Sequence, residues 1–261
     1  MYPELFDIQL PSFLGGQEIT IYSYATCIVL GTLIAAVYTR WSAKKDLGIT
    51  NLSNTFFYFI FIAGFIGGKF FYYMQNPQLY IENPSLMLDN FSGGFVFYGS
   101  FVTIIPFIIW YLKKQKMNVL AMLDIFAITT IIVHALGRMG CFMAGCCFGK
   151  STESFLGIIF PTTSVKVHPT QLYEVGMLVT IFMVLIALKK RKQFNGQLFL
   201  IYLILYGIGR STLELFRGDE RGFIIQNLIS HSQFIALCLI SIAAYFYFKL
   251  HKQLTINTFN N

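Results

Sequence analysis

The chain has 261 residues, of which 56% are hydrophobic and 12% are charged, and its formal net charge is +7. The charged fraction is about half that of a typical soluble domain, and the mean hydropathy is +0.62. This composition excludes an ordinary soluble domain and indicates a polytopic membrane protein. The five cysteines show no paired framework, which argues against a disulfide-rich secreted domain. We expect no cleavable signal peptide, because residues 1–18 contain no Lys or Arg.

Apolar runs divide the chain into candidate membrane spans. A helix needs about 20 apolar residues to cross the hydrocarbon core. Four charge-free runs reach this length, and three shorter runs reach it when they are extended through the charges that bound them. We therefore predict an all-α fold with seven transmembrane helices in one membrane domain over residues 1–261. The predicted spans are residues 19–40, 54–75, 94–112, 119–139, 169–188, 197–217 and 228–248.

Most of the basic residues follow spans one, three, five and seven. They are Arg40, Lys44, Lys45, Lys113, Lys114, Lys116, Lys189, Lys190, Arg191, Lys192, Lys249 and Lys252. Under the positive-inside rule these loops are cytoplasmic. We therefore expect the N-terminus outside and the C-terminus in the cytoplasm. This topology explains the positive charge without a nucleic-acid partner.

The other seven cations fall toward the outer half of the membrane under this topology. They are Lys69, Arg138, Lys150, Lys166, Arg210, Arg217 and Arg221. An arginine near the bilayer must meet an anion, a carbonyl or water, so it is a candidate for a functional site. Independent helices bring these cations to one depth. We interpret the stretch 134–150, HALGRMGCFMAGCCFGK, as one wall of a phospholipid headgroup site.

Span six carries four polar residues, Tyr206, Arg210, Glu214 and Arg217, at spacings of four, four and three. This spacing places them on one helix face. Arg210 and Glu214 could form a structural ion pair, or Glu214 could hold a guanidinium against a bound phosphate. The ion pair alone would leave Arg138, Arg217 and Lys69 without anions, and arginine suits phosphate oxygens.

Span five begins with the sequence VHPTQLYE, in which a proline can occupy the first helical turn. His168 would lie at the outer mouth, with Gln171, Tyr173 and Glu174 in the first turns. His168 is either a solvated cap or a proton carrier near neutral pH. His134, one turn before Arg138, is either a second carrier or a buried structural residue.

The cysteines Cys141, Cys146 and Cys147 have the spacing C-x4-C-C. This is not a standard zinc pattern, and we predict no metal site and no cofactor. Three interpretations stay open: small packing residues, a disulfide on the oxidising outer face, or a covalent thiol relay.

Four pieces of the chain resemble the prolipoprotein diacylglyceryl transferase family. They are GGFVFYGSF (93–101), GRMGCFMAGCCFG (137–149), HPTQLYE (168–174) and YGIGRSTLELFRGD (206–219). The resemblance implies a bacterial plasma-membrane enzyme with seven spans and an active site toward the outer leaflet. Such an enzyme moves the diacylglyceryl group of phosphatidylglycerol onto the lipobox cysteine thiol of a prolipoprotein and releases glycerol phosphate.

The resemblance, which covers Arg138, Tyr206, Arg210 and Glu214, and the charge and spacing patterns described above together predict roles for single residues. The expected catalytic residues are Arg138, Arg210, Glu214, His168 and Tyr206. The arginines would stabilise the charge on the departing phosphate, and His168 would take the thiol proton. The expected substrate-binding residues are Lys69, Tyr24, Tyr98, Cys141, Gly149, Gln171, Tyr173, Glu174, Arg217 and His134. The partners would be phosphatidylglycerol, prolipoprotein signal peptides with a lipobox cysteine, and membrane lipids.

The chain departs from the family pattern at several positions. Tyr98 stands where the family commonly has an essential His, and Cys141, Ala144 and Cys146 replace two Asn and a Glu of the signature. The usual base is therefore missing, and His134 or His168 could replace it. Two alternatives follow: transfer of the same lipid group to another acceptor, or a non-catalytic binder or transporter of anionic lipid. A transporter could show related halves, and the sequence has none.

Overall fold

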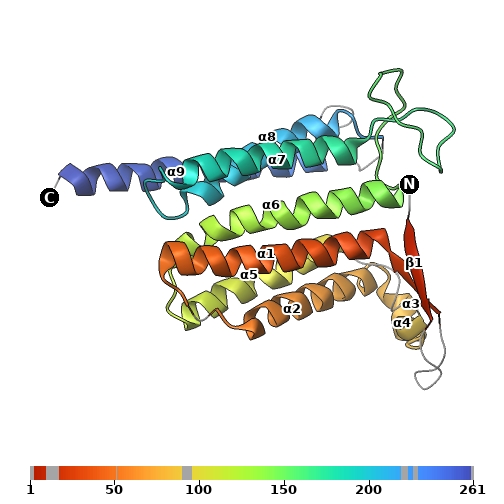
Figure 1. Cartoon of the computed structure of the whole chain (residues 1–261), viewed down its shortest axis with the longest axis horizontal. Coiled ribbons are helices and arrows are strands. Elements are labelled where there is room, and N and C mark those ends of the chain that lie inside the picture. The colour runs from red at the N-terminus through yellow and green to blue at the C-terminus, as the bar shows by residue number, and fades with distance from the viewer. Residues whose placement is uncertain are drawn as a thin grey trace. The chain divides into compact units, whose positions relative to one another are not determined.

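The computed structural model describes residues 3–9, 18–50, 52–89, 96–218, 223–225 and 229–259 (Figure 1). These residues are mostly helical. The chain divides into two compact units, one of Met1–Ser42 with Leu123–Asn261 and the other of Ala43–Met122. The elements are β1 (Glu4–Gln9), β2 (Glu18–Tyr22), α1 (Ser23–Leu47), α2 (Asn54–Tyr73), α3 (Pro77–Glu82), α4 (Leu86–Asp89), α5 (Phe97–Lys114), α6 (Val119–Ala144), α7 (Thr170–Lys189), α8 (Gln197–Glu214), β3 (Phe223–Ile225), β4 (Ile229–Ser230) and α9 (His231–Phe259).

A long helix lies at each of the seven predicted spans. Among the described residues, five segments are long and apolar enough to cross a membrane: α1, α2, α6, α7 and the Ser232–Thr255 part of α9. Two helices of 18 residues each, α5 and α8, occupy the predicted spans 94–112 and 197–217. The prediction of a helical, multi-pass membrane protein is confirmed. The count of seven spans, the single domain and the orientation of the termini stay predictions.

The helix boundaries differ from the predicted ones at both ends of the chain. Residues 19–22, expected at the start of span one, belong to β2, which pairs antiparallel with β1. The β2 sequence EITIY alternates and contains β-branched residues, which suits a strand. At the other end, α9 continues to Phe259, beyond the predicted end at residue 248.

The core of the first unit lies between α6, α7 and α8. It is formed by Ala127, Ile128, Ile131, Leu178, Ile181, Leu185, Leu198 and Tyr202. On each helix these residues recur at spacings of one, three or four, which gives one apolar face directed at the neighbours. Helix α8 also packs against α9.

Small residues let α1 approach α6 closely at the arginine end. A Cβ added at Gly140 would lie 3.1 Å from the Cα of Tyr24 and 3.1 Å from the Cβ of Cys27. One added at Gly137 would lie 3.1 Å from Ile28. Small residues at an interface permit such contact between helices in membranes. The glycines on both sides of Arg138 therefore hold Tyr24 next to the end of α6.

Polar contacts fix the opposite ends of the same helices. The buried carboxylate of Asp124 accepts hydrogen bonds from the backbone N–H groups of Gly196 (2.9 Å) and Phe199 (3.1 Å) and pairs with Lys192 (3.1 Å). This carboxylate caps the start of α8. The Lys189 ammonium donates a hydrogen bond of 2.7 Å to Ser42 of α1. These contacts set the axial register of the helices in the first unit.

The second unit is built around α2 and α5, which pack closely through small residues. The hydroxyl of Ser100 donates to the carbonyl of Gly64 at 2.7 Å, and that of Thr103 donates to the carbonyl of Ala63 at 2.8 Å. A Cβ at Gly67 would lie 2.6 Å from the carbonyl oxygen of Gly99. Gly64 and Gly67 of α2 therefore permit close helix approach.

Candidate functional site

A buried carboxylate, Glu174 of α7, gathers three polar side chains from α6 and α8. Its Oε2 lies 2.8 Å from Nε of Arg138, and its Oε1 lies 3.1 Å from Nε2 of His134. The hydroxyl of Tyr206 donates to Oε1 at 3.4 Å. The Glu174 side chain is only 3% exposed, and a buried carboxylate needs such partners. We name these four residues the Glu174 cluster.

The Glu174 cluster has a simple origin in helix geometry. His134 and Arg138 are four residues apart on α6, so they lie on one face. Each helix is anchored at its far end by a polar contact, at Asp124 on α6, Gly196 before α8 and Lys189 on α7. Arg138 and Arg210 each lie fourteen residues from their anchor, and Glu174 lies fifteen residues from its anchor. At a rise of about 1.5 Å per residue, each site residue lies roughly 21–23 Å from its anchored end. The three helices therefore present their charges at one level.

A second ion pair lies one turn from the end of α8. The Nη1 atom of Arg210 is 2.7 Å from Oε2 of Glu214, and both side chains are 11% exposed. The hydroxyl of Ser232, in the first turn of α9, donates to Oε1 of Glu214 at 2.7 Å. The charges of Arg138 and Arg210 both act on Glu174 and on the Tyr206 hydroxyl. Two guanidinium groups, each held by its own carboxylate, therefore both exert their charge on Glu174.

The partner of Arg138 corrects one step of the sequence interpretation. We expected Arg138 to lack an anion within the protein, and this is wrong, because Glu174 pairs with it. The Arg210–Glu214 pair, one of the two interpretations left open, is present. A guanidinium has five N–H donors, and the pair with Glu174 engages Nε of Arg138. Among the described residues, no side-chain hydrogen bond or ion pair engages its two terminal nitrogens, so these can bind a ligand anion.

The loop that carries His168 is joined to two other segments. Gly149 donates its backbone N–H to the carbonyl of His168 (2.8 Å), and Lys150 donates to that of Phe216 (2.9 Å). A Cβ at Gly149 would lie 2.8 Å from Cγ2 of Thr170 and closer still to the Phe216 carbonyl. Gly149 therefore permits three chain segments to meet. This is a packing role, while its role in substrate binding stays a prediction.

His168 itself lies with aromatic residues. Its Nδ1 is 3.0 Å from the Tyr173 hydroxyl, and its ring meets that of Phe216 at 5.2 Å. Within the part of the chain that the structure describes, no hydrogen bond, ion pair or ring contact joins it to the Glu174 cluster. The structure thus brings His134, rather than His168, to the arginine and the carboxylate.

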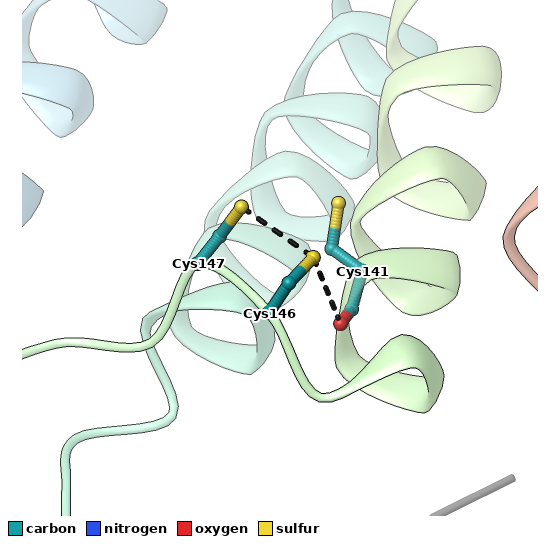
Figure 2. Close-up of side chains that lie close together, drawn as sticks. All are labelled: Cys141, Cys146 and Cys147. Carbon is teal, nitrogen blue, oxygen red and sulfur yellow. Dashed lines mark hydrogen bonds between the residues drawn. The ribbon is translucent and has the colours of Figure 1, made fainter. Parts of the chain in front are cut away.

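Three cysteines lie together where α6 ends (Figure 2). The sulfurs of Cys141, Cys146 and Cys147 are all within 4.8 Å of one another, and those of Cys146 and Cys147 are 3.6 Å apart. All three are free thiols, and Cys146 and Cys147 are exposed. The packing interpretation therefore does not hold for these two. We name the three residues the cysteine cluster.

The cysteine cluster is tied to α7 and to the arginines. Thr170 donates its hydroxyl hydrogen to the carbonyl of Cys147 (2.9 Å), and the Gln171 amide donates to the carbonyl of Cys146. The amide oxygen of Gln171 is buried without a hydrogen-bond partner among the described residues. Hydrogen bonds with Cys141 and Cys146, together with the charges of Arg138 and Arg217, hold the pKa of the Cys147 thiol below its ordinary value.

The remaining expected residues are placed as follows. Tyr24 packs on Gly140, and it interacts electrostatically with Cys141 and Arg138. Arg217 is buried and its backbone forms a bridge with Gly149. Lys69 belongs to the second unit, where it is buried with its Nζ 5.5 Å from the centre of the Tyr72 ring. The side chain of Tyr98, also in the second unit, lies outside the described residues, and so does Arg221. A role for Lys69 and Tyr98 at the site stays a prediction.

Sequence reasoning missed two features of this site. Ser232 was not expected to hold Glu214, because nothing in a lone serine at a helix start indicates a partner 18 residues earlier. The meeting of three thiols was also missed, because C-x4-C-C is not a recognised ligand spacing.

Comparison with known proteins bears on the whole chain. The model of the prolipoprotein diacylglyceryl transferase family matches residues 11–249. The chain belongs to this family. Among its relatives, the phosphatidylglycerol–prolipoprotein diacylglyceryl transferase of Clostridium tetani is 34% identical over 233 residues, covering 86% of this chain and 91% of the relative. Transferase 2 of Clostridium perfringens is 32% identical, covering 84% and 87%, and the transferase of Finegoldia magna is 29% identical, covering 90% and 94%.

Family membership confirms the resemblance that the four sequence motifs indicated. Its matched range, residues 11–249, includes every member of the Glu174 cluster, the Arg210–Glu214 pair and the cysteine cluster. The polar groups described above therefore lie within the family's own fold rather than in an added segment.

Proposed function

We propose that this chain transfers the diacylglyceryl group of phosphatidylglycerol to the lipobox cysteine thiol of prolipoproteins and releases glycerol phosphate. The names of its relatives state this transferase activity. The observation that carries the proposal is the pair of guanidinium groups, Arg138 held by Glu174 and Arg210 held by Glu214, whose charges both act on Glu174.

The arginines serve the departing phosphate. The acceptor sulfur forms a bond to the lipid glycerol carbon, the C–O bond to the phosphate breaks, and glycerol phosphate leaves with the bonding electrons. Negative charge therefore grows on the phosphate oxygens. Prepositioned N–H donors in a poorly solvated site stabilise such charge without reorganising, and the terminal nitrogens of Arg138 suit phosphate oxygens.

The carboxylates keep the arginines in position before lipid binds. Two guanidinium groups near each other repel, and each is held by an acidic partner within 2.8 Å. Neither pair uses every N–H of its arginine. The side chains are thus ordered without being saturated, which is what a site for an incoming anion requires.

The thiol proton passes to His134 in this proposal. A thiolate, not a thiol, is the nucleophile, so a base must accept the proton. His134 is hydrogen-bonded to Glu174 at 3.1 Å, and a carboxylate that orients an imidazole supports general-base catalysis. The contacts of His168 are with Tyr173 and Phe216, so we assign His168 to the loop that forms the site wall.

The site opens toward the outer leaflet of a bacterial plasma membrane in this proposal. The basic residues Lys189–Lys192 lie at the anchored end of the first unit, and the positive-inside rule makes that end cytoplasmic. The arginines lie roughly 21 Å further along the helices, out of a hydrocarbon thickness of about 30 Å. They therefore approach the opposite interface, where the lipid headgroup and the membrane-anchored acceptor meet.

The test is a transfer assay with purified protein in phosphatidylglycerol vesicles. A peptide with a lipobox cysteine should gain a diacylglyceryl thioether, read by mass spectrometry, while the same peptide with Ser in place of that Cys should not. If the lipid binds and the cysteine peptide gains no thioether, the chain is a lipid binder or uses another acceptor, and the proposal fails.

A further inference from the structure

The cysteine cluster has the geometry of a ligand set for a thiophilic cation. Zinc binds thiolates at about 2.3 Å, so three sulfurs on one ion lie about 3.8–4.0 Å apart. Here one pair lies at 3.6 Å and every pair within 4.8 Å. A shift of under about 1 Å in one side chain completes the set. Figure 2 shows the three sulfurs close together, at the corners of a triangle.

The backbone is bent to bring adjacent thiols together. Neighbouring side chains on an extended chain point to opposite sides. Gly145 and Cys147 both have left-handed conformations, with φ of 72° and 65°, on either side of Cys146. For a residue other than glycine this conformation is unfavourable, because Cβ approaches the following carbonyl oxygen. The fold nevertheless holds Cys147 in this conformation, and the sulfurs of Cys146 and Cys147 lie 3.6 Å apart as a result.

Contacts that do not involve the sulfurs hold the loop in this conformation. Cys146 donates its backbone N–H to the carbonyl of Cys141 at 3.1 Å. Thr170 and Gln171 of α7 bind the carbonyls of Cys147 and Cys146. The thiols are therefore positioned in advance, as a metal site requires.

The charges around the cluster match a zinc complex of three thiolates. Three thiolates and one Zn²⁺ carry a net charge of −1. The charges of Arg138 and Arg217 both act on Cys147, so the complex is attracted to two cations. Two of the sulfurs are exposed, which leaves one side of such an ion open. Catalytic zinc sites likewise have three protein ligands and an open fourth position.

We propose that Cys141, Cys146 and Cys147 bind one zinc ion and that its open fourth position takes the acceptor thiol, a role that rests on the proposed transfer reaction. Zinc coordination deprotonates a thiol, and the proton goes to His134. The bonds that form and break at the lipid are unchanged.

The first experiment measures metal binding alone. Reduced, metal-free, full-length protein in detergent is titrated with Cd²⁺, which reports thiolate ligation by its ultraviolet charge-transfer absorption. We expect one Cd²⁺ per chain, displaced by Zn²⁺, and protection of the 141–147 peptide from maleimide by Zn²⁺. Cys146→Ser and Cys141→Ala should each weaken binding by more than about 100-fold. The Cys27→Ser/Cys238→Ser double variant, a matched control outside the cluster, should bind as the parent does.

Two results overturn the metal site. One is saturable one-to-one binding that persists in both Cys146→Ser and Cys141→Ala. The other is maleimide labelling of the 141–147 peptide that Zn²⁺ leaves unchanged. Because Cys141 lies in α6 and Cys146 in the loop, a folding defect in one variant leaves the other as an independent test.

The second experiment tests the open position. Protein loaded with Co²⁺ should change its visible absorption when a lipobox peptide is added, and the peptide with Ser in place of Cys should cause no change. An unchanged spectrum with the cysteine peptide overturns the thiol role. Full transfer activity in metal-free protein would also overturn the thiol role, but the proposed function would stand. Intact metal binding without any transfer would overturn the proposed function, but the metal site would stand.

Discussion

Glu174→Gln is the substitution that tests the Glu174 cluster most directly. The carboxylate is 3% exposed and pairs with Arg138 at 2.8 Å and with His134 at 3.1 Å. Glutamine has nearly the same shape but no charge. It leaves a partly buried guanidinium without its anion and an imidazole without the carboxylate that orients it.

The structure sets the size of both effects. Breaking a buried ion pair costs about 3–5 kcal/mol. Because the Arg138 side chain is 19% exposed, we expect the free energy of unfolding to fall by about 3 kcal/mol, the lower end of this range. General-base catalysis contributes a factor of about 10²–10⁴. With His134 no longer oriented, kcat should fall by at least about 100-fold, or roughly 2.7 kcal/mol in activation free energy.

The measurement is thioether formation in phosphatidylglycerol vesicles, with thermal or denaturant unfolding in detergent on the same samples. Glu153→Gln is the matched control, because Glu153 is exposed in the loop between α6 and α7, and both quantities should stay at the parent values. A Glu174→Gln protein that retains kcat within about threefold of the parent would contradict the reasoning.

Three further predictions concern the same end of the molecule. Arg138→Ala and Arg210→Ala should each lower kcat by about 10²–10³, because each removes prepositioned donors for the departing phosphate; retained turnover in both would remove the anion site. His134→Gln should slow transfer by at least about 100-fold, while His168→Gln should cost less than about tenfold, and the reverse order would return the base to His168. Gly149→Ala should lower the unfolding midpoint, since its Cβ would lie 2.8 Å from Thr170 and closer to a backbone carbonyl.

The glycine prediction has its own control within α7. A Cβ added at Gly176 meets no heavy atom within 4 Å, so Gly176→Ala should leave stability unchanged or raise it by up to about 1 kcal/mol, the helix propensity difference. Equal midpoints for the Gly149 and Gly176 variants would show that the three segments at Gly149 do not need to meet so closely.

The helices and the Arg210–Glu214 pair could be predicted because local rules determine them. Apolar runs of spanning length give the helices, and a spacing of four places two charges on one face. Arg138 and Glu174 are 36 residues apart on different helices, and their pairing depends on how α6 and α7 turn about their axes. Packing of the whole core sets that rotation, so spacing within one helix does not reveal it.

The cysteine cluster was beyond sequence reasoning for a different reason. Its assembly depends on a left-handed conformation at Cys147, with φ of 65°, which residues other than glycine seldom adopt. The pairing of β1 with β2 was also missed. A charge-free run that continues from a five-residue strand into a helix is counted as one membrane span.

The cap that Asp124 places on α8 links the start of this helix to the position of Arg210 near its other end. If α8 slid by one residue against Asp124, Arg210 would advance by about 1.5 Å and rotate by about 100° about the helix axis. That rotation would turn Arg210 and Tyr206 together away from Glu174 of α7, to which Tyr206 now donates a hydrogen bond. A substitution such as Asp124→Ala, fourteen residues from Arg138, should therefore disturb side chains that lie roughly 21 Å away along the helices.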